Sequence, residues 1–228
     1  MKKFFTLILL AATFLVTACG GDQSGDKPAS TEKPASTDKP ASTEKPASTD
    51  KPASNGKKIL VVYFSRTGEE YNVGRITKGN TAIVAEFIAQ KTGADTFEIK
   101  AETPYPDGYE ECTALAKREL EENVRPKFAA NVDNLAQYDT VFIGFPIWWG
   151  AVPRVLLTFL EANDFSGKTI IPFCTHGGSG LAGTEREIAN ACPNATLRDG
   201  LAIVGKQCQD APDAVRKDVD AWLKNLGY

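Results

Sequence analysis

Short apolar runs rich in β-branched residues recur along the chain after residue 57, and most of them are followed by a segment of helical spacing. The first run, ILVVYF at 59–64, is continuous, which is typical of a strand buried on both faces. Strands of that kind belong to parallel sheets, whose neighbours are joined by crossover helices. We therefore predict an α/β fold with a five-stranded parallel sheet and helices on both faces, with strands at 59–64, 96–99, 140–143, 169–173 and 201–204.

Apolar residues three or four positions apart predict the helices between these strands. They fall at 83–88, 109–123, 152–160 and 215–226, and the second helix is expected to turn Cys112, Leu115, Ala116 and Leu120 inward. An open parallel sheet binds ligands at the carboxyl ends of its strands, beside the point where the strand order reverses. A functional site is therefore expected in the loops after the first, third and fourth strands.

Residues 1–19 have the features of an export signal rather than of a folded domain. Lys2 and Lys3 precede an apolar stretch at 4–16, and small residues lead up to Cys19. An apolar run of about a dozen residues is shorter than the roughly 20 that span a bilayer, which disfavours a permanent anchor helix. The sequence around Cys19 resembles the lipobox of bacterial lipoproteins. This predicts lipidation of Cys19 and an extracytoplasmic protein anchored to a bacterial membrane, with cleavage without lipidation as the alternative.

Residues 20–56 repeat a hexad, KPASTE or KPASTD, that ends in KPASNG. Apolar side chains larger than alanine and proline are almost absent from this segment, so it cannot build a core. Regular proline and nearly balanced charge predict an extended, soluble tether, and an adhesive or wall-binding repeat is the alternative. The remaining residues, 57–228, have the size of one domain.

The formal net charge of the chain is −3 and its sequence has no basic cluster, which argues against a nucleic-acid partner. Besides Cys19 the chain has Cys112, Cys174, Cys192 and Cys208. These cysteines are either free or paired in an oxidising compartment, and the sequence does not choose between the possible pairings. Their spacing matches no zinc site, so no metal is predicted.

The loop after the first strand contains the residue types that bind a phosphate at a helix N-terminus. These residues are Ser65, Arg66, Thr67 and Gly68 and, after an insertion at 69–79, Asn80 and Thr81. The same residue types are common in turns and helix caps, which is the alternative. The chain has neither the lysine of a P-loop nor a GxGxxG pattern, and this weighs against ATP, GTP and dinucleotides.

Two adjacent indoles occupy the loop after the third strand, in the run Pro146, Ile147, Trp148, Trp149 and Gly150. Consecutive loop residues point apart, so we expect one indole to stack on a flat ring while the other packs against the fold or lies at the rim. Gly150 lets the backbone come close to a ligand. A pair of packing or interface tryptophans and a sugar-binding platform are the alternatives.

The loop after the fourth strand is rich in glycine and contains the only histidine of the chain. It comprises Thr175, His176, Gly177, Gly178, Ser179 and Gly180. A backbone of this kind can hydrogen-bond the polar edge of a heterocycle, and His176 is expected to donate to a ring edge unless it is an ordinary loop histidine. No acid is paired with His176 and no serine lies in a nucleophile elbow, so no catalytic side chain is predicted.

Together, YFSRTG with a following NT, GFPIWWG, and PFCTHGGSG resemble motifs of the flavodoxin family, in particular of a flavodoxin-like branch with a PIWWG loop, over residues 57–228. The resemblance implies a three-layer sandwich with strand order 2-1-3-4-5 and bound FMN. It assigns residues 65–68, 80 and 81 to the FMN phosphate, residues 146–150 to the isoalloxazine, and residues 175–180 to the polar edge of the ring. The insertion at 69–79 is expected either to fold over the phosphate, with Arg75 or Lys78 as added charge, or to displace the loop.

The function that this resemblance implies is an FMN-binding redox protein that transfers electrons in the cell envelope. The chain lacks the acceptor motif for covalent FMN, so the cofactor is expected to be non-covalent. The partner is expected to be a redox protein or a quinone-like small molecule, with the lipid on Cys19 holding the protein at the membrane. The alternatives are an FMN-dependent reductase of a quinone or other small molecule, a non-redox binding module that has lost FMN, and a disulfide-dependent structural protein.

Overall fold

The computed structural model describes residues 58–228. The predicted signal peptide at 1–19, the predicted lipidation site at Cys19 and the predicted tether at 20–56 lie outside the described residues. Within residues 58–228, no helix is both long enough and apolar enough to cross a membrane.

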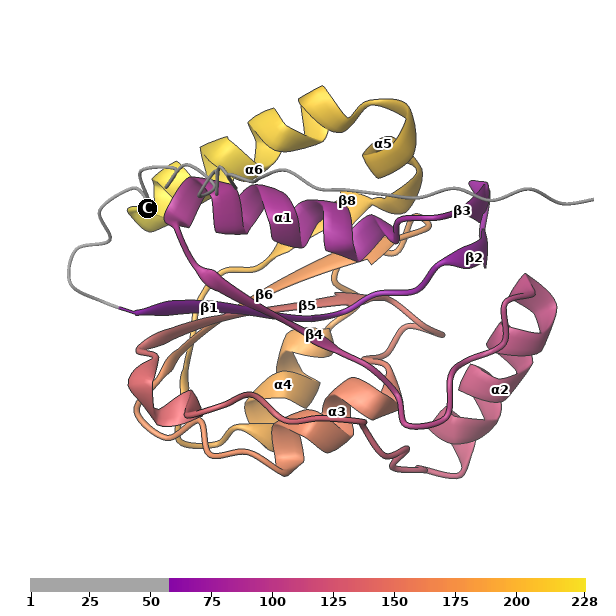
Figure 1. Cartoon of the computed structure of the whole chain (residues 1–228), viewed down its shortest axis with the longest axis horizontal. Coiled ribbons are helices and arrows are strands. Elements are labelled where there is room, and N and C mark those ends of the chain that lie inside the picture. Colours follow the sequence, from indigo (N-terminus) through magenta and orange to yellow (C-terminus); the bar gives the residue numbers. More distant parts are fainter. Residues whose placement is uncertain (1–57) are drawn as a thin grey trace, which may run out of the picture. The chain divides into compact units, whose positions relative to one another are not determined.

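One parallel sheet forms the middle layer of the domain (Figure 1). Its order is β4 (Asp95–Ile99), β1 (Ile59–Phe64), β5 (Thr140–Pro146) and β6 (Thr169–His176), followed by β7 (Thr196–Leu197) and β8 (Leu201–Val204). Both of the last two strands pair with β6, β7 beside its beginning and β8 beside its end. The predicted order 2-1-3-4-5 is confirmed, and two short strands share the fifth position.

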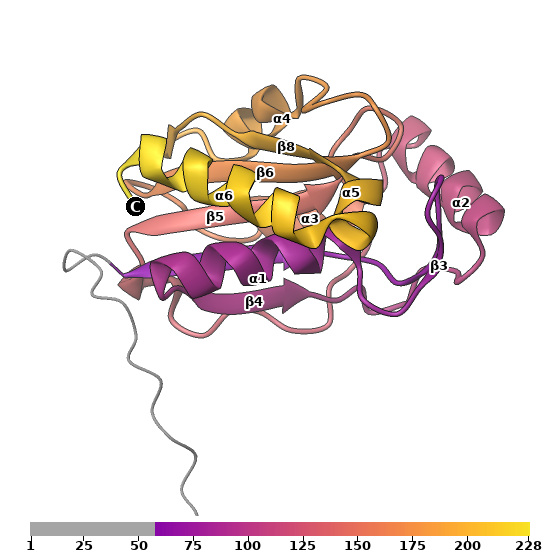
Figure 2. The ribbon, with the colours of Figure 1, turned by 90° about the horizontal axis from the view of Figure 1, so that it is seen from above.

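Helices cover both faces of this sheet (Figure 2). One face carries α1 (Asn80–Thr92), α5 (Gly205–Asp210) and α6 (Pro212–Leu226), and the other carries α3 (Arg154–Glu161) and α4 (Thr184–Ala191). The helices α4 and α5 were not predicted, because α4, with the sequence TEREIANA, has one large apolar residue and α5 is only 6 residues long, so neither shows a period. A short 3-10 helix, η1 (Leu135–Gln137), precedes β5.

Side chains of β1 alternate between two separate parts of the core. Leu60, Val62 and Phe64 pack on the side of α3, whereas Ile59 and Val61 pack on the side of α1 and α6. Both sets must be apolar because helices cover both faces, and this explains why the run at 59–64 is continuous.

The helix α2 (Tyr109–Glu121) stands at the carboxyl end of the sheet rather than over one of its faces (Figures 1 and 2). Beside it lies an antiparallel hairpin of β2 (Gly68–Glu70) and β3 (Gly74–Ile76), which the insertion forms. Because α2 packs on loops, its expected inner face is only partly buried. Cys112 and Ala116 are buried, but Leu115 and Leu120 are half-buried and Glu119 is buried as well.

Candidate functional site

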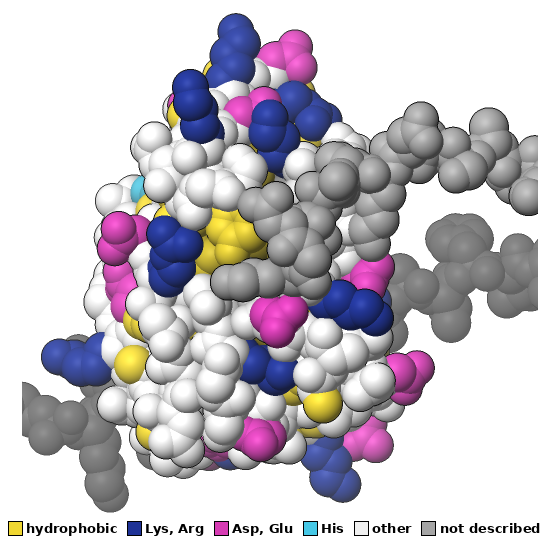
Figure 3. Space-filling view, turned by 90° about the vertical axis from the view of Figure 1, so that its left-hand side faces the viewer, with side chains coloured by type: hydrophobic (Ala, Val, Ile, Leu, Met, Phe, Trp, Pro, Cys, Tyr) yellow, Lys and Arg dark blue, Asp and Glu magenta, His cyan; other side chains and the backbone are white. Residues whose placement is uncertain are grey.

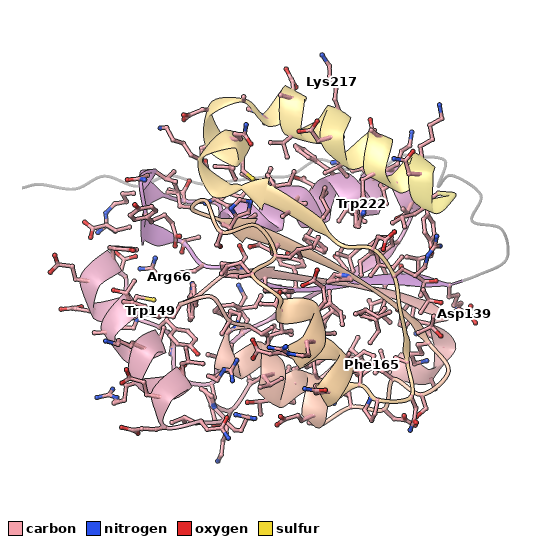
Figure 4. The ribbon with its side chains drawn as sticks, turned by 180° about the vertical axis from the view of Figure 1, so that it is seen from behind. Arg66, Asp139, Trp149, Phe165, Lys217 and Trp222 are labelled. Carbon is pink, nitrogen blue, oxygen red and sulfur yellow. The ribbon has the colours of Figure 1, made fainter. Side chains whose placement is uncertain are left out.

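A cavity of about 320 Å³ lies at the carboxyl ends of β1, β5, β6 and β8, where the strand order reverses. Figure 4 shows Arg66 and Trp149 at this end of the sheet, beside α2. The predicted residues that line the cavity are Arg66, Asn80, Pro146, Ile147, Trp148, Trp149, Thr175, His176 and Gly177. The lining residues that were not predicted are Glu70, Tyr71, Asn72, Val73, Tyr109, Cys112, Thr113, Ala116, Val204, Gly205 and Lys206.

The indole loop is a tight turn that sends its two tryptophans in different directions. Trp148 N–H donates to the Ala151 carbonyl (3.1 Å) and Ala151 N–H donates to the Trp148 carbonyl (3.0 Å). The two central residues have positive φ, 53° at Trp149 and 74° at Gly150, which is the backbone of a type I′ turn. Positive φ is unfavourable for a residue as large as tryptophan, so backbone strain is stored at the position that carries Trp149.

Trp148 packs inward while Trp149 lies at the rim of the cavity. The Trp148 ring makes edge contacts with Phe64 (5.3 Å between centroids) and Tyr105 (4.9 Å). Trp149 is 55% exposed, and its indole N–H donates to the Thr113 carbonyl of α2 (2.9 Å). Lys117 Nζ lies 5.3 Å from the centroid of the Trp149 ring. The expected division between a packing indole and a rim indole is therefore present, and the structure identifies which is which.

We expect Gly150→Ala to lower the free energy of unfolding by about 1 kcal/mol, because alanine at positive φ is strained and nothing else changes. A Cβ atom at Gly150 would meet no atom within 4 Å, so steric overlap does not contribute. Gly150→Asn is the matched control, since asparagine tolerates this backbone region better than alanine. Urea unfolding measures both variants, and an equal loss for alanine and asparagine would contradict the strain argument.

The glycine loop after β6 is organised around the side chain of His176. Its Nδ1 accepts hydrogen bonds from the backbone N–H groups of Gly178 (2.9 Å) and Gly180 (3.2 Å). A nitrogen that accepts in this way is unprotonated, so the ring proton sits on Nε2. Burial lowers the pKa of His176, which keeps the imidazole neutral at neutral pH. Two of the expected backbone donors are thus used within the loop, and His176 is left with one N–H donor.

The hydroxyl groups expected at a phosphate do not converge on the cavity. Ser65 Oγ accepts from the backbone N–H of Ala82 and so caps α1 (3.1 Å). The hydroxyls of Thr81 and Thr175 bond to each other in the core (2.8 Å). Ser65 and Thr67 instead line a separate cavity of about 290 Å³ between the ends of β1 and β4.

Arg66 uses its guanidinium to join the hairpin to the segment before α2. Nε and Nη2 donate to the Pro106 carbonyl (3.2 and 2.9 Å), and Nη2 also donates to the carbonyls of Asp107 (2.7 Å) and Gly108 (3.3 Å). Nη1 donates to the Glu69 carbonyl and to the Glu70 carboxylate, both at 2.5 Å. These bonds engage every nitrogen of the guanidinium, so the expected phosphate role of Arg66 does not fit its position.

The insertion forms the hairpin of β2 and β3, and its residues 70–73 line the cavity. Tyr71 at the tip of the hairpin lies against Gly177, where an added Cβ atom would come within 2.8 Å of the tyrosine ring. The ring of Tyr71 also lies 5.9 Å from that of Tyr109 on α2. The expected cations point elsewhere, because Arg75 pairs with Asp107 and Lys78 pairs with Glu86. The sequence signal for this hairpin was the pair Gly68 and Gly74, with Tyr71 and Val73 two positions apart between them.

Comparison with known proteins places this architecture in a family. Residues 58–226 match a family model described as flavodoxin. The chain belongs to the flavodoxin family. Among curated proteins, none matches the chain.

Solved flavoprotein structures share the flavodoxin fold of this chain. A candidate flavoprotein from Bacteroides uniformis is 32% identical, with a TM-score of 0.60, over 74% of this chain and 99% of that one. A second, from Bacteroides eggerthii, is 29% identical, with a TM-score of 0.59, over 75% and 99% of the two chains. A Lactobacillus acidophilus flavoprotein in complex with FMN is 19% identical, with a TM-score of 0.52, over 68% and 97%, and it shows the fold alone.

The flavodoxin motifs of the chain are only partly gathered at the cavity. The residues assigned from these motifs that do not line it are Ser65, Thr67, Gly68, Thr81, Gly150, Gly178, Ser179 and Gly180. Some of them support residues that do, as Gly150 supports the turn of Trp149 and Gly178 supports His176. The lining residues that sequence reasoning missed come from the insertion, α2 and the β8–α5 junction.

The four cysteines of the described residues are all free and buried, so they form no disulfide. Burial raises the pKa of Cys112 to about 11 and that of each of the other three to about 12. They are therefore thiols at neutral pH, which makes them poor nucleophiles. This arrangement gives no support to the alternative of a disulfide-dependent structural protein.

Proposed function

We propose that this member of the flavodoxin family binds FMN non-covalently in the cavity at the carboxyl end of its sheet and transfers electrons in the cell envelope. The single observation that carries the proposal is the position of that cavity, at the reversal of strand order with an exposed indole at its rim. The FMN complex of the Lactobacillus acidophilus flavoprotein, which has the same fold, supports FMN as the ligand.

The chemistry of the lining fits a flavin. Trp149 offers a half-exposed aromatic face, and neutral His176 offers one N–H donor to a heterocycle. Tyr71 and Tyr109 add a second aromatic wall from the insertion and α2. An aromatic lining with a few polar groups is typical of sites that bind planar cofactors.

FMN, when bound, supplies the capacity to accept and release electrons. The residues of this chain orient the ring, exclude water from it and place a neutral donor beside it. The cavity lining contains one carboxylate, Glu70, and this side chain is paired with Arg66. We therefore assign no acid or base catalysis to the chain.

The rim of the cavity suits an electron-transfer partner. Tyr71, Trp149 and Val204 are large apolar side chains that are more than one third exposed, and all three line the cavity. Exposed apolar groups that gather at one site mark a contact surface. Away from the rim, basic and acidic side chains are interspersed on the side shown in Figure 3. We propose a redox protein of the envelope as the partner, since the sequence around Cys19 predicts a chain outside the cytoplasm, where nicotinamide donors are scarce.

A second candidate function is the reduction of a quinone-like small molecule by the same cofactor. The apolar rim of Tyr71, Trp149 and Val204 favours it, because a planar aromatic acceptor would contact the same side chains. The two candidates differ in one measurement. A quinone reductase turns over with soluble quinone and a chemical donor, whereas a carrier requires its protein partner.

The proposal is tested by titrating the purified full-length protein with FMN while following flavin fluorescence, and then adding dithionite without oxygen. We expect saturable quenching and bleaching of the flavin that reverses when air is admitted. A protein that stays colourless after incubation with FMN would overturn the proposal in favour of a binding module that has lost its flavin.

A further inference from the structure

The cavity has two cationic side chains among its lining residues, Arg66 and Lys206. The donors of Arg66 are used by carbonyl groups and by Glu70, as described above. Lys206, the second residue of α5, is more than half exposed and has one charged partner, Asp210, at 2.9 Å and one helical turn away. Exposed pairs of this kind are weak, so Lys206 can turn toward a ligand at little cost.

A second, independent feature beside Lys206 is a buried amide that lacks an acceptor. Asn80 is 9% exposed and lines the cavity. Its Oδ1 accepts from Gln209 Nε2 (2.8 Å), which also donates to the Lys78 carbonyl (2.9 Å), so the orientation of the Asn80 amide is determined. Its Nδ2 group has no acceptor within residues 58–228, and no side-chain polar atom of these residues is both fully buried and unpaired, so this N–H group is accessible from the cavity.

Gly205 connects these two features. A Cβ atom at Gly205 would lie 2.9 Å from Asn80 Nδ2, so glycine at this position lets the amide approach the start of α5 closely. The next residue along the chain is Lys206. An unpaired N–H donor and a mobile ammonium on adjacent parts of one cavity form a recognition pair for an anionic oxygen.

We propose that Lys206 provides the positive charge for the phosphate of FMN, next to the Asn80 amide, and thereby determines the preference for FMN over riboflavin. The inference rests on the proposed function and makes it more specific. The cation that binds the phosphate is then Lys206, at the junction of β8 and α5, and not Arg66 in the loop after β1, as the sequence suggested. Glu70, the one carboxylate among the described lining residues, adds little repulsion to the phosphate because it is paired with Arg66.

The test compares dissociation constants of the full-length protein for FMN and for riboflavin, which differ only in the phosphate. We expect Lys206→Gln to weaken FMN binding about fivefold, the upper range for a partly screened charge pair, and to leave riboflavin binding unchanged. Lys206→Arg keeps the charge and is expected to retain most of the FMN affinity. Lys78→Gln is the matched control, because Lys78 precedes α1, is similarly exposed and does not line the cavity.

The outcomes separate this inference from the proposed function. If Lys206→Gln has the same ratio of FMN to riboflavin affinity as the wild type, the inference is wrong while flavin binding stands. Equal affinities of the wild type for FMN and riboflavin would also overturn it, since no group would then recognise the phosphate. A wild type that binds neither flavin overturns the proposed function and this inference together.

Discussion

Replacing Arg66 by alanine is expected to lower the free energy of unfolding by about 3–5 kcal/mol, the range for removing one partner of a buried ion pair. The side chains of Arg66 and Glu70 are 8% and 19% exposed, so the variant would leave the Glu70 carboxylate buried without its cation. The variant would also remove the donors to the carbonyls of residues 106–108. Urea unfolding of the full-length protein measures the loss.

The matched control is Arg75→Ala, on the same hairpin. Arg75 pairs with Asp107, but both side chains are more than 60% exposed, so we expect no resolvable change in the unfolding midpoint. Burial already raises the pKa of Glu70. In Arg66→Ala the destabilisation should therefore shrink as the pH falls and Glu70 takes up a proton, and adding Glu70→Gln should recover part of it. A loss no larger than that of the control would show that the bonds of Arg66 to Glu70 and to residues 106–108 do not stabilise the fold.

Trp148→Ala is expected to lower mainly the stability of the fold, whereas Trp149→Ala is expected to lower mainly the affinity for FMN. Trp148 contacts Phe64 and Tyr105 and is half-buried, so its removal should lower the free energy of unfolding by about 3 kcal/mol. Trp149 is exposed at the rim, so its removal should cost little stability but weaken FMN binding by about 1–3 kcal/mol. Unfolding curves and FMN titrations of both variants test the division.

Two outcomes would contradict the proposed division between Trp148 and Trp149. If Trp149→Ala binds FMN with unchanged affinity, the ring does not stack on this residue. If both variants lose stability equally, the turn holds both indoles as packing residues, which was the alternative reading of the sequence.

The sheet and the location of its site were predictable because they follow from local patterns. Predicted strands 59–64 and 201–204 coincide with β1 and β8. In β1, burial on both faces leaves an apolar run with sharp ends. The switch-point rule then pointed to the loops that line the cavity, and three motifs in order indicated the family that the comparison with known proteins confirmed.

The cap over the site could not be predicted in the same way. The hairpin at 68–76 contains few apolar residues, and α2 looks like any helix that covers a sheet. Their position depends on the contacts of Glu69 and Arg66 with residues 106–109, which are about forty positions away in the chain. No periodicity in either segment records such a contact.

The sequence by itself determined the layers of the domain and the three loops that meet at the cavity, because hydrophobic periodicity and turn residues act over short distances, and the resemblance of its motifs to the flavodoxin family added the strand order. Only the tertiary structure decided what each polar side chain in those loops does. Arg66 lies in a loop whose residue types predict a phosphate site, but its guanidinium donates to the carbonyls of residues 106–108. Lys206 belongs to no motif recognised in the sequence, but the fold brings it to the cavity. Hydrogen bonds go to the partners that folding places within reach, and those partners are distant in sequence.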